Sequence, residues 1–174
     1  MKWLKGGLGQ FGFKMWLDRN ASRMLSEAGI CKGQVVLDFG CGSGTYTIPA
    51  AKLVGEKGTV YALDISSKAL GKMTRKAERE GLRNIVRTHS SGGDKIPLED
   101  RAVDVIMLID VLQEIDDRDA LFDEAYRILK HEGLVIVYPM HIETEEVKRI
   151  ATLRGLDLHQ EKHEGRILVF RKET

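Results

Sequence analysis

The stretch QVVLDFGCGSG, residues 34–44, decides the fold of this chain. Residues 34–39, QVVLDF, are mostly apolar and predict a buried strand, and a loop with Gly40, Gly42 and Gly44 follows it. Glycines at this spacing let the chain turn sharply and bring its backbone close to a ligand. The helix predicted next, through Val54, points its free N–H groups and positive dipole end at the same place. The stretch therefore predicts a ligand-binding turn between a strand and a helix.

An acidic residue stands where a nucleotide ribose would need one. Asp64 lies twenty residues after Gly44, at the end of the strand predicted over residues 59–63. A carboxylate there can accept hydrogen bonds from ribose hydroxyls. Ligands of parallel sheets bind at the carboxyl ends of the strands, where both features lie. Together they predict a nucleotide site.

The pattern argues against the two commonest nucleotide loops. The dinucleotide pattern G-x-G-x-x-G/A would need glycine or alanine where the chain has Thr45 or Thr47, and the phosphate-binding pattern G-x-x-x-x-G-K-[ST] is absent. Asp38, which opens the loop, would repel phosphates and attract an ammonium group. A nicotinamide oxidoreductase is therefore disfavoured.

Outside this stretch, strand and helix patterns alternate. We expect strands over 34–39, 59–63, 84–88, 102–109 and 134–138, helices over 13–28, 44–54, 66–81, 119–130 and 143–154, and a closing hairpin of 156–163 and 166–170. Repeated strand–helix units predict an α/β, Rossmann-like fold. Its seven-stranded sheet would be mostly parallel, with helices on both faces and an antiparallel C-terminal edge hairpin. Residues 13–174 would be one domain, and residues 1–12 a flexible glycine and aromatic arm, because dense glycine disfavours regular structure.

Composition narrows the class of protein. The 174 residues carry 27 Lys+Arg and 26 Asp+Glu, a net charge of +1, which argues against a broad basic surface for nucleic acid. Two cysteines, Cys31 and Cys41, exclude a disulfide-built fold and a four-thiolate zinc site. The apolar runs are too short to span a bilayer, and the N-terminus lacks the apolar core of a signal peptide. We expect a cytoplasmic protein with no resident metal.

The motifs resemble those of one enzyme family. DFGCGSG with Asp64 is similar to motif I and the following acid of class I S-adenosylmethionine (SAM) methyltransferases. Residues 96–117, IPLEDRAVDVIMLIDVLQEIDD, and residues 124–137, EAYRILKHEGLVIV, resemble the later motifs of its quinone-biosynthesis-like branch. The resemblance covers residues 30–171.

The resemblance implies SAM as cofactor, S-adenosylhomocysteine as product, and a set of binding residues. Gly40, Cys41, Gly42 and Gly44 would line its methionine and ribose end, Asp38 would lie near the ammonium, and Asp64 would hold the ribose; Ile65, His89 and Ser90 would border adenine, and Asp110 would face the methionine part and the acceptor. The acid that contacts the adenine amino group in the family falls on Gly92 here, which makes Asp94 the alternative.

The expected reaction is in-line transfer of a methyl group to a small-molecule acceptor. Orientation can supply about 7–11 kcal/mol of such a barrier, and a general base only about 3–5 kcal/mol, so the catalytic residues stay unknown. His141 and Glu114, which follow two predicted strands, are candidates for a base. One alternative is a SAM-binding module without turnover that acts on a partner protein. The sequence leaves a homodimer open and does not name the acceptor.

Overall fold

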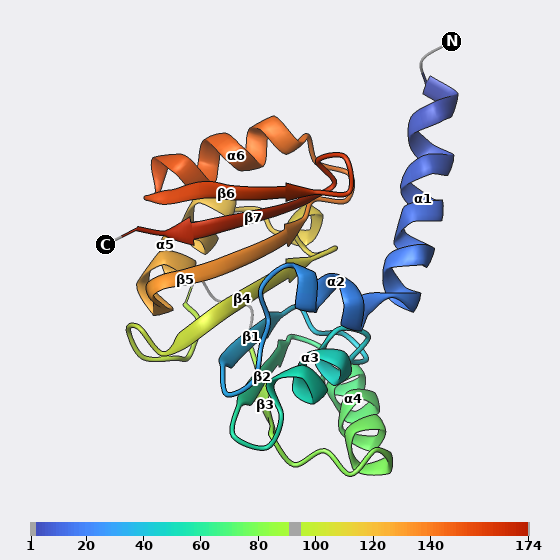
Figure 1. Cartoon of the computed structure of the whole chain (residues 1–174), viewed down its shortest axis with the longest axis vertical. Coiled ribbons are helices and arrows are strands. Elements are labelled where there is room, and N and C mark those ends of the chain that lie inside the picture. Colours follow the sequence, from blue (N-terminus) through green and yellow to red (C-terminus); the bar gives the residue numbers. More distant parts are fainter. Residues whose placement is uncertain (1–2, 91–94, 174) are drawn as a thin grey trace.

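A seven-stranded sheet forms the centre of the molecule (Figure 1). The computed structural model describes residues 3–90 and 95–173, with the backbone alone for residues 3–8. The strands are β1 (Val35–Phe39), β2 (Thr59–Asp64), β3 (Ile85–His89), β4 (Val103–Ile109), β5 (Leu129–Tyr138), β6 (Leu156–Lys162) and β7 (Ile167–Lys172). Their order is β3-β2-β1-β4-β5-β7-β6. Strands β1 to β5 are parallel and β7 is antiparallel to both of its neighbours, which confirms the predicted fold.

The strand order reverses between β1 and β4. From β1 the chain builds outward through β2 and β3, then returns to place β4 on the other side of β1. Register pairs join these central strands, Val36 with Val105 and Asp38 with Met107. Two loops that leave the sheet in opposite directions open a crevice at such a point, where ligands of α/β sheets bind.

Helices cover both faces of the sheet. Neighbouring residues of a strand point to opposite sides, so the apolar strands present an apolar surface on each face. Val36 and Met107 pack with the helices α1 to α3, whereas Leu37 and Leu108 pack with α5 and α6 on the other face. The helical elements are α1 (Trp3–Arg19), α2 (Ala21–Glu27), α3 (Thr47–Val54), α4 (Ser67–Arg79), the short 3₁₀ helix η1 (Leu112–Glu114), α5 (Arg118–Ile128) and α6 (Thr144–Leu153).

Side-chain caps set the starts of two helices. The hydroxyl of Ser66 accepts a hydrogen bond from the Ala69 N–H at 3.2 Å, so Ser66 caps α4 at the start of the helix predicted over residues 66–81. The carboxylate of Asp117 does the same for the Ala120 N–H at 2.9 Å and starts α5. These caps place the first turns of α4 and α5 near the carboxyl edge of the sheet.

The N-terminal region differs from the prediction. We expected one helix over residues 13–28 and no regular structure before it. Instead α1 extends back to Trp3 and ends at Arg19, and a separate helix, α2, begins at Ala21. Tertiary contacts support the glycine-rich turns: Arg166 donates to the Gly9 carbonyl at 3.1 Å, and Tyr138 donates to the Gln10 carbonyl at 3.4 Å. The expected boundary at residue 12 therefore does not separate a coil from a helix.

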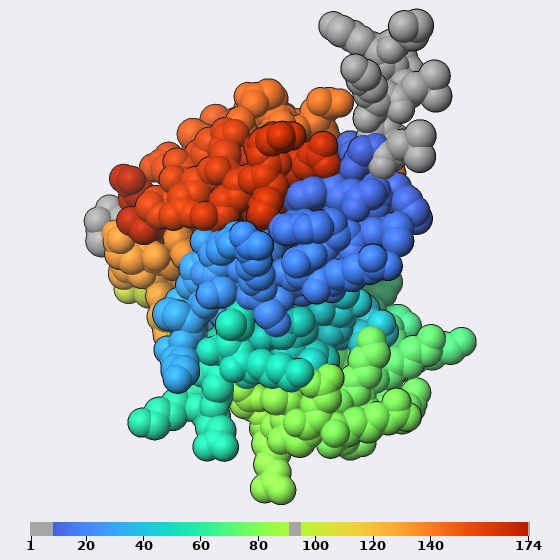
Figure 2. Space-filling model, turned by 45° about the vertical axis from the view of Figure 1, so that its right-hand side comes forward, coloured from blue at the N-terminus to red at the C-terminus, as the bar shows by residue number. Residues whose placement is uncertain are grey.

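These contacts join the two ends of the chain. Figure 2 shows the first described helix, in blue, directly beside the C-terminal hairpin of β6 and β7, in red. The Arg166 guanidinium lies 5.0 Å from the centre of the Phe13 ring and anchors the middle of α1. In the part of the chain that the structure describes, no helix is long and apolar enough to cross a bilayer.

Candidate cofactor site

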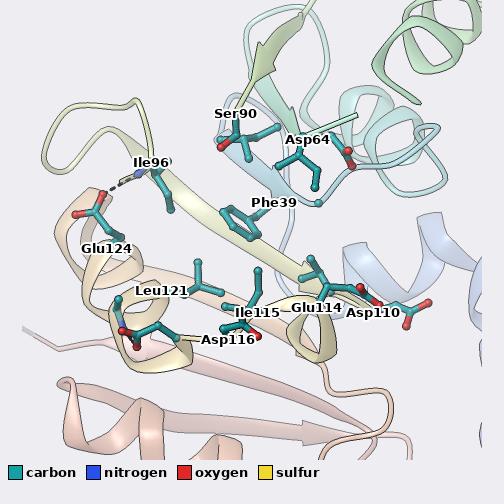
Figure 3. A pocket seen from close by; sticks show the side chains of 16 residues that line it. Phe39, Asp64, Ser90, Ile96, Asp110, Glu114, Ile115, Asp116, Leu121 and Glu124 are labelled. Atoms are coloured by element: carbon teal, nitrogen blue, oxygen red, sulfur yellow. Dashed lines mark hydrogen bonds between the residues drawn. The ribbon is translucent and has the colours of Figure 1, made fainter. Parts of the chain in front are cut away.

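A cavity of about 500 Å³ lies at the carboxyl edge of the sheet, where the strand order reverses. Its walls come from the ends of β1, β2 and β4, from η1 and from the start of α5 (Figure 3). The lining residues are Phe39, Gly40, Leu63, Asp64, Ile65, Ser90, Ile96, Asp110, Val111, Glu114, Ile115, Asp116, Asp117, Ala120, Leu121 and Glu124. We call it the first cavity.

Asp64 stands on one wall of the first cavity and is held by two backbone groups. Its Oδ2 accepts from the Gly42 N–H at 2.8 Å, and its Oδ1 accepts from the Ser66 N–H at 2.8 Å. A carboxylate oxygen has two acceptor sites, so each oxygen keeps one for a further donor. Asp64 can therefore accept two hydroxyl groups without giving up either contact.

The glycine loop is shaped by close packing at one position and by open space at another. A Cβ built on Gly40 would lie 2.4 Å from Cγ2 of Val111, so only glycine lets β1 end this near the segment after β4. Gly42 has φ of +51°, and a Cβ there would meet no atom within 4 Å. The loop therefore leaves open space beside its backbone at Gly42.

Asp110 directly follows β4 and has a strained backbone conformation. Its φ is +57°, a region that residues with a side chain adopt rarely and that is frequent at functional sites. The Gln113 side chain donates to Asp110 Oδ1 at 2.9 Å, and Lys14 Nζ of α1 lies 3.6 Å from Oδ2. The backbone N–H of Asp110 donates to the Tyr138 carbonyl at 3.2 Å. These contacts turn the carboxylate toward α1, at the margin of the first cavity.

The structure brings six of the sequence-predicted residues to the walls of this cavity. They are Gly40, Asp64, Ile65, Ser90, Asp110 and Glu114. Ile65 leaves 69% of its surface exposed, which suits a side chain that packs on a planar ring. Figure 3 shows Asp64 and Ser90 on the opposite side of the cavity from Asp110 and Glu114.

The remaining predicted residues do not line the cavity. His89 instead hydrogen-bonds through Nε2 to the Ile65 carbonyl at 3.0 Å, and Gly42 and Gly44 belong to the loop behind Gly40. A Cβ on Gly44 would lie 2.7 Å from Met73 of α4, so this glycine serves packing. Gly92 and Asp94, the candidates for the adenine contact, lie outside the described residues.

Asp38 and Cys41 are buried beneath the loop. The Thr47 hydroxyl donates to Asp38 Oδ2 at 2.5 Å, and burial raises the pKa of Asp38 to about 7. Burial also raises the pKa of the Cys41 thiol, whose side chain packs with Ala62 and Leu70. The Cys41 side chain therefore packs in the core and is not activated as a nucleophile.

The charge of the first cavity suits a cationic ligand. Six carboxylates line it, Asp64, Asp110, Glu114, Asp116, Asp117 and Glu124, and among its described lining residues there is no Lys or Arg. Arg127 neutralises one of them by donating to Glu124 at 2.7 Å. SAM carries a sulfonium and an ammonium beside one carboxylate, so it is cationic overall. The acceptor oxygens of Asp64, the apolar Ile65 and this negative wall fit its ribose, base and charge.

A second cavity, of about 550 Å³, lies at the end of β5. It is polar and includes His141, whose φ is +64°, and Arg166. Its other lining residues are Gln10, Tyr138, Pro139, Met140, Ile142, Glu143, Thr144, Glu145, Lys148, Glu161, Glu164 and Gly165. The two base candidates are thus separated: Glu114 lines the first cavity and His141 the second.

Sequence reasoning missed most of the apolar wall and the contribution of α1. Phe39, Ile96 and Leu121 line the cavity but look like ordinary core residues in the sequence, because strand and helix periodicity does not say which core position faces a hollow. Nothing in the sequence singles out Lys14, yet its side chain is only 18% exposed and its Nζ lies 3.6 Å from Asp110 Oδ2. No pattern around Lys14 indicates this contact.

The family model described as "Methyltransferase domain" matches residues 30–166. This range includes the strands β1 to β6 and all residues that line the first cavity. The chain belongs to this methyltransferase family. The match confirms the family expected from the glycine loop and Asp64, and with it the use of SAM. Among the described residues of this methyltransferase, no group of three His, Cys, Asp or Glu is placed to hold a metal ion.

The methyltransferase is similar in sequence to quinone-biosynthesis enzymes. It is 32% identical over 103 residues to the demethylmenaquinone methyltransferase of Lactobacillus johnsonii, which covers 59% of this chain and 42% of that protein. It is 34% identical over 115 residues to the ubiquinone/menaquinone biosynthesis C-methyltransferase UbiE of Escherichia coli, with coverage of 63% and 44%. The chain thus spans less than half the length of these relatives.

Solved structures show the same fold. A SAM-dependent methyltransferase from Aquifex aeolicus superposes with a TM-score of 0.77 at 26% identity, covering 89% of this chain and 90% of that one. The [4+2]-cyclase SpnF also superposes with a TM-score of 0.77, at 15% identity and with coverage of 90% and 81%. The second likeness shows the fold alone.

Proposed function

We propose that this methyltransferase transfers the methyl group of SAM to a small polar or aromatic molecule. The observation that carries the proposal is Asp64, fixed by two backbone N–H groups on the wall of a negatively charged cavity at the strand-order reversal. The quinone-biosynthesis relatives support a small-molecule acceptor. When bound, SAM supplies an electrophilic methyl group on a sulfonium sulfur.

The residues of the chain contribute chiefly by holding and desolvating the reactants. Asp64 would orient the ribose, Ile65 and Phe39 would pack against the base, and Asp110 would face the methionine part. Orientation of two reactants in one site can supply about 7–11 kcal/mol of a bimolecular barrier. The acidic wall also favours the positive sulfonium, so it would strengthen binding of the donor over the neutral product.

The acceptor would lie between the two cavities. The N–H of Asp110, from the first cavity, donates to the carbonyl of Tyr138, from the second, so the loops after β4 and β5 meet there. Glu114 lines the first cavity and His141 the second, and these two side chains would be the candidates to take a proton from the acceptor. Loss of a true base should lower turnover about 10²- to 10⁴-fold and leave SAM binding unchanged.

The test first compares the affinities of candidate cofactors and then measures methyl transfer to candidate acceptors. By calorimetry the protein should bind SAM and S-adenosylhomocysteine, and bind NAD more weakly or not at all. With labelled SAM, a panel of phenols, hydroquinones and amines should reveal label transfer that Glu114→Gln or His141→Ala reduces. Tighter binding of NAD than of S-adenosylhomocysteine would overturn the proposal. Tight SAM binding without transfer to any acceptor of the panel would favour the alternative function. That alternative is a SAM-binding module without turnover that acts on a partner protein.

A further inference from the structure

Helix α1 places a cation, Lys14, beside Asp110 at the margin of the first cavity. Lys14 Nζ lies 2.6 Å from Asp18 Oδ1 and 3.6 Å from Asp110 Oδ2, and 5.5 Å from the centre of the Tyr46 ring. The side chain is only 18% exposed. Lys14 therefore does not belong to a solvated helix face, and its ammonium group is directed at the end of β4.

The neighbours of Lys14 come from three elements and fix its position. The Tyr46 hydroxyl, next to the glycine loop, donates to Asp18 Oδ1 at 2.6 Å, the same oxygen that accepts from Lys14. Burial raises the pKa of Tyr46, so the phenol stays neutral and remains a donor. Tyr46, Asp18 and Lys14 thus link the start of α3 to α1 and hold the ammonium beside Asp110.

Of the two ion pairs that Lys14 makes, the one with Asp110 is longer than the one with Asp18. Its 3.6 Å exceeds the 2.7–2.9 Å of a charge-assisted hydrogen bond, whereas the contact between Lys14 and Asp18 is fully formed. Lys14 and Asp110 present a positive and a negative group side by side, each with free hydrogen-bonding capacity. A zwitterionic amino acid head carries the matching pair of charges.

We infer that Lys14 binds the carboxylate of the methionine part of SAM, with Asp110 as the partner of its ammonium group, so that α1 forms part of the cofactor site. The inference rests on the proposed function. The described lining of the first cavity holds six carboxylates and no Lys or Arg, so a bound carboxylate needs a cation from outside that wall. Lys14 reaches the cavity margin at Asp110 and supplies it.

A second lysine, Lys76, approaches the glycine loop. Lys76 of α4 donates to the Ser43 hydroxyl at 3.4 Å, on the side of the loop that packs against α4. Neither Lys76 nor Ser43 lines the first cavity. Lys76 is therefore the rival that an experiment has to separate from Lys14, and Lys52, which pairs with Glu80 on the surface, is a control.

The test uses two ligands that differ in the methionine part. S-adenosylhomocysteine has the amino acid head, and 5′-methylthioadenosine lacks it but keeps the ribose, the base and the sulfur. We expect Lys14→Met to weaken S-adenosylhomocysteine roughly tenfold or more and to leave 5′-methylthioadenosine within about twofold, since a charged hydrogen bond is lost from one ligand only. Lys14→Arg should largely restore the affinity for S-adenosylhomocysteine. Lys76→Met and Lys52→Met should change neither affinity.

The outcomes separate this inference from the proposed function. If the protein binds both ligands and Lys14→Met weakens them equally, or not at all, Lys14 only anchors α1 and the inference is wrong. A selective loss in Lys76→Met would overturn it in favour of the rival lysine. If the unaltered protein binds neither ligand, the proposed function fails and the inference fails with it. Melting curves without ligand show whether each variant is folded before its affinities are compared.

Discussion

The carboxylate of Asp64 accepts the backbone N–H of Gly42 at 2.8 Å, and so ties the end of β2 to the glycine loop. The side chain that would hold the ribose is thus also the one that holds the loop in place. A ligand that bonds to Asp64 meets a loop already fixed in position, so little backbone has to be ordered on binding. Preorganisation of this kind strengthens binding by lowering its entropic cost.

Replacement of this carboxylate should weaken binding more than it weakens the fold. Asp64→Ala removes the acceptors of the ribose hydroxyls, so affinity for S-adenosylhomocysteine should fall roughly 10- to 150-fold, or about 1.5–3 kcal/mol. Unlike the effect of Lys14→Met, the loss should be the same for 5′-methylthioadenosine. Calorimetry with both ligands measures this, and an affinity for either within twofold of the unaltered protein would show that Asp64 does not anchor the ribose.

Two glycines of the loop should respond differently to alanine. Both have positive φ, which costs a residue with a Cβ about 1–2 kcal/mol. In Gly40→Ala the new Cβ would also lie 2.4 Å from Val111, whereas Gly42→Ala meets open space. Chemical denaturation should show the larger loss of stability for Gly40→Ala, and Val111→Ala in the same chain should restore part of it.

The two glycine variants also separate an effect on stability from an effect on ligand binding. Gly42→Ala places a methyl group on the bare backbone beside Asp64, so it should weaken S-adenosylhomocysteine more than its modest loss of stability implies. Equal stability losses for the two variants, with no rescue by Val111→Ala, would contradict the packing argument.

The buried Asp38 should make stability depend on pH. Its pKa is raised from 3.8 to about 7 in the folded protein. Between pH 4 and 7 the folded protein keeps this proton while the unfolded chain has released it, so the free energy of unfolding falls as the pH rises. Asp38→Asn keeps an acceptor for the Thr47 hydroxyl and cannot ionise. Relative to this variant, the unaltered protein should lose on the order of 1–4 kcal/mol between pH 4 and 7.

Denaturation at several pH values checks this prediction. A constant difference between Asp38→Asn and the unaltered protein across that range would show that Asp38 titrates normally. Because Asp38 is also the predicted neighbour of the cofactor ammonium, added SAM should favour the ionised form and reduce the pH dependence. If SAM leaves the pH dependence unaltered, the predicted proximity to the ammonium is wrong.

Removal of residues 1–12 should affect the site more than the fold. The described core of α1 begins at Phe13, Trp16 and Leu17, and the two hydrogen bonds at the Gly9 and Gln10 carbonyls contribute about 0.5–1.5 kcal/mol each. We propose that the described part of this segment, residues 9–12, covers the acceptor side of the crevice, since Gln10 lines the second cavity. The melting temperature should therefore fall by a few degrees at most, and turnover should fall much more than affinity for SAM. A large drop in melting temperature would place residues 1–12 in the core.

The sequence by itself determined the strand–helix alternation, the parallel sheet and the glycine loop followed by Asp64. These follow from local chemistry, since strand and helix periods, a Ser66 cap and glycines before a helix act over a few residues. They placed Gly40, Asp64, Ile65, Ser90 and Asp110 at one edge of the sheet, where all five line the first cavity.

Only the tertiary structure decided the extent of α1 and the contacts that several predicted site residues make. Glycines near the N-terminus predict irregular chain, but Tyr138 and Arg166, more than 120 residues away, hold the backbone of α1 at Gln10 and Gly9. Cys41 and His89 have the right position in the sequence, yet their side chains turn to the core and to the Ile65 carbonyl. Lys14 reaches Asp110 because α1 packs across the carboxyl end of β4, a contact between residues 96 positions apart. Such contacts depend on how whole elements dock, which no local pattern encodes.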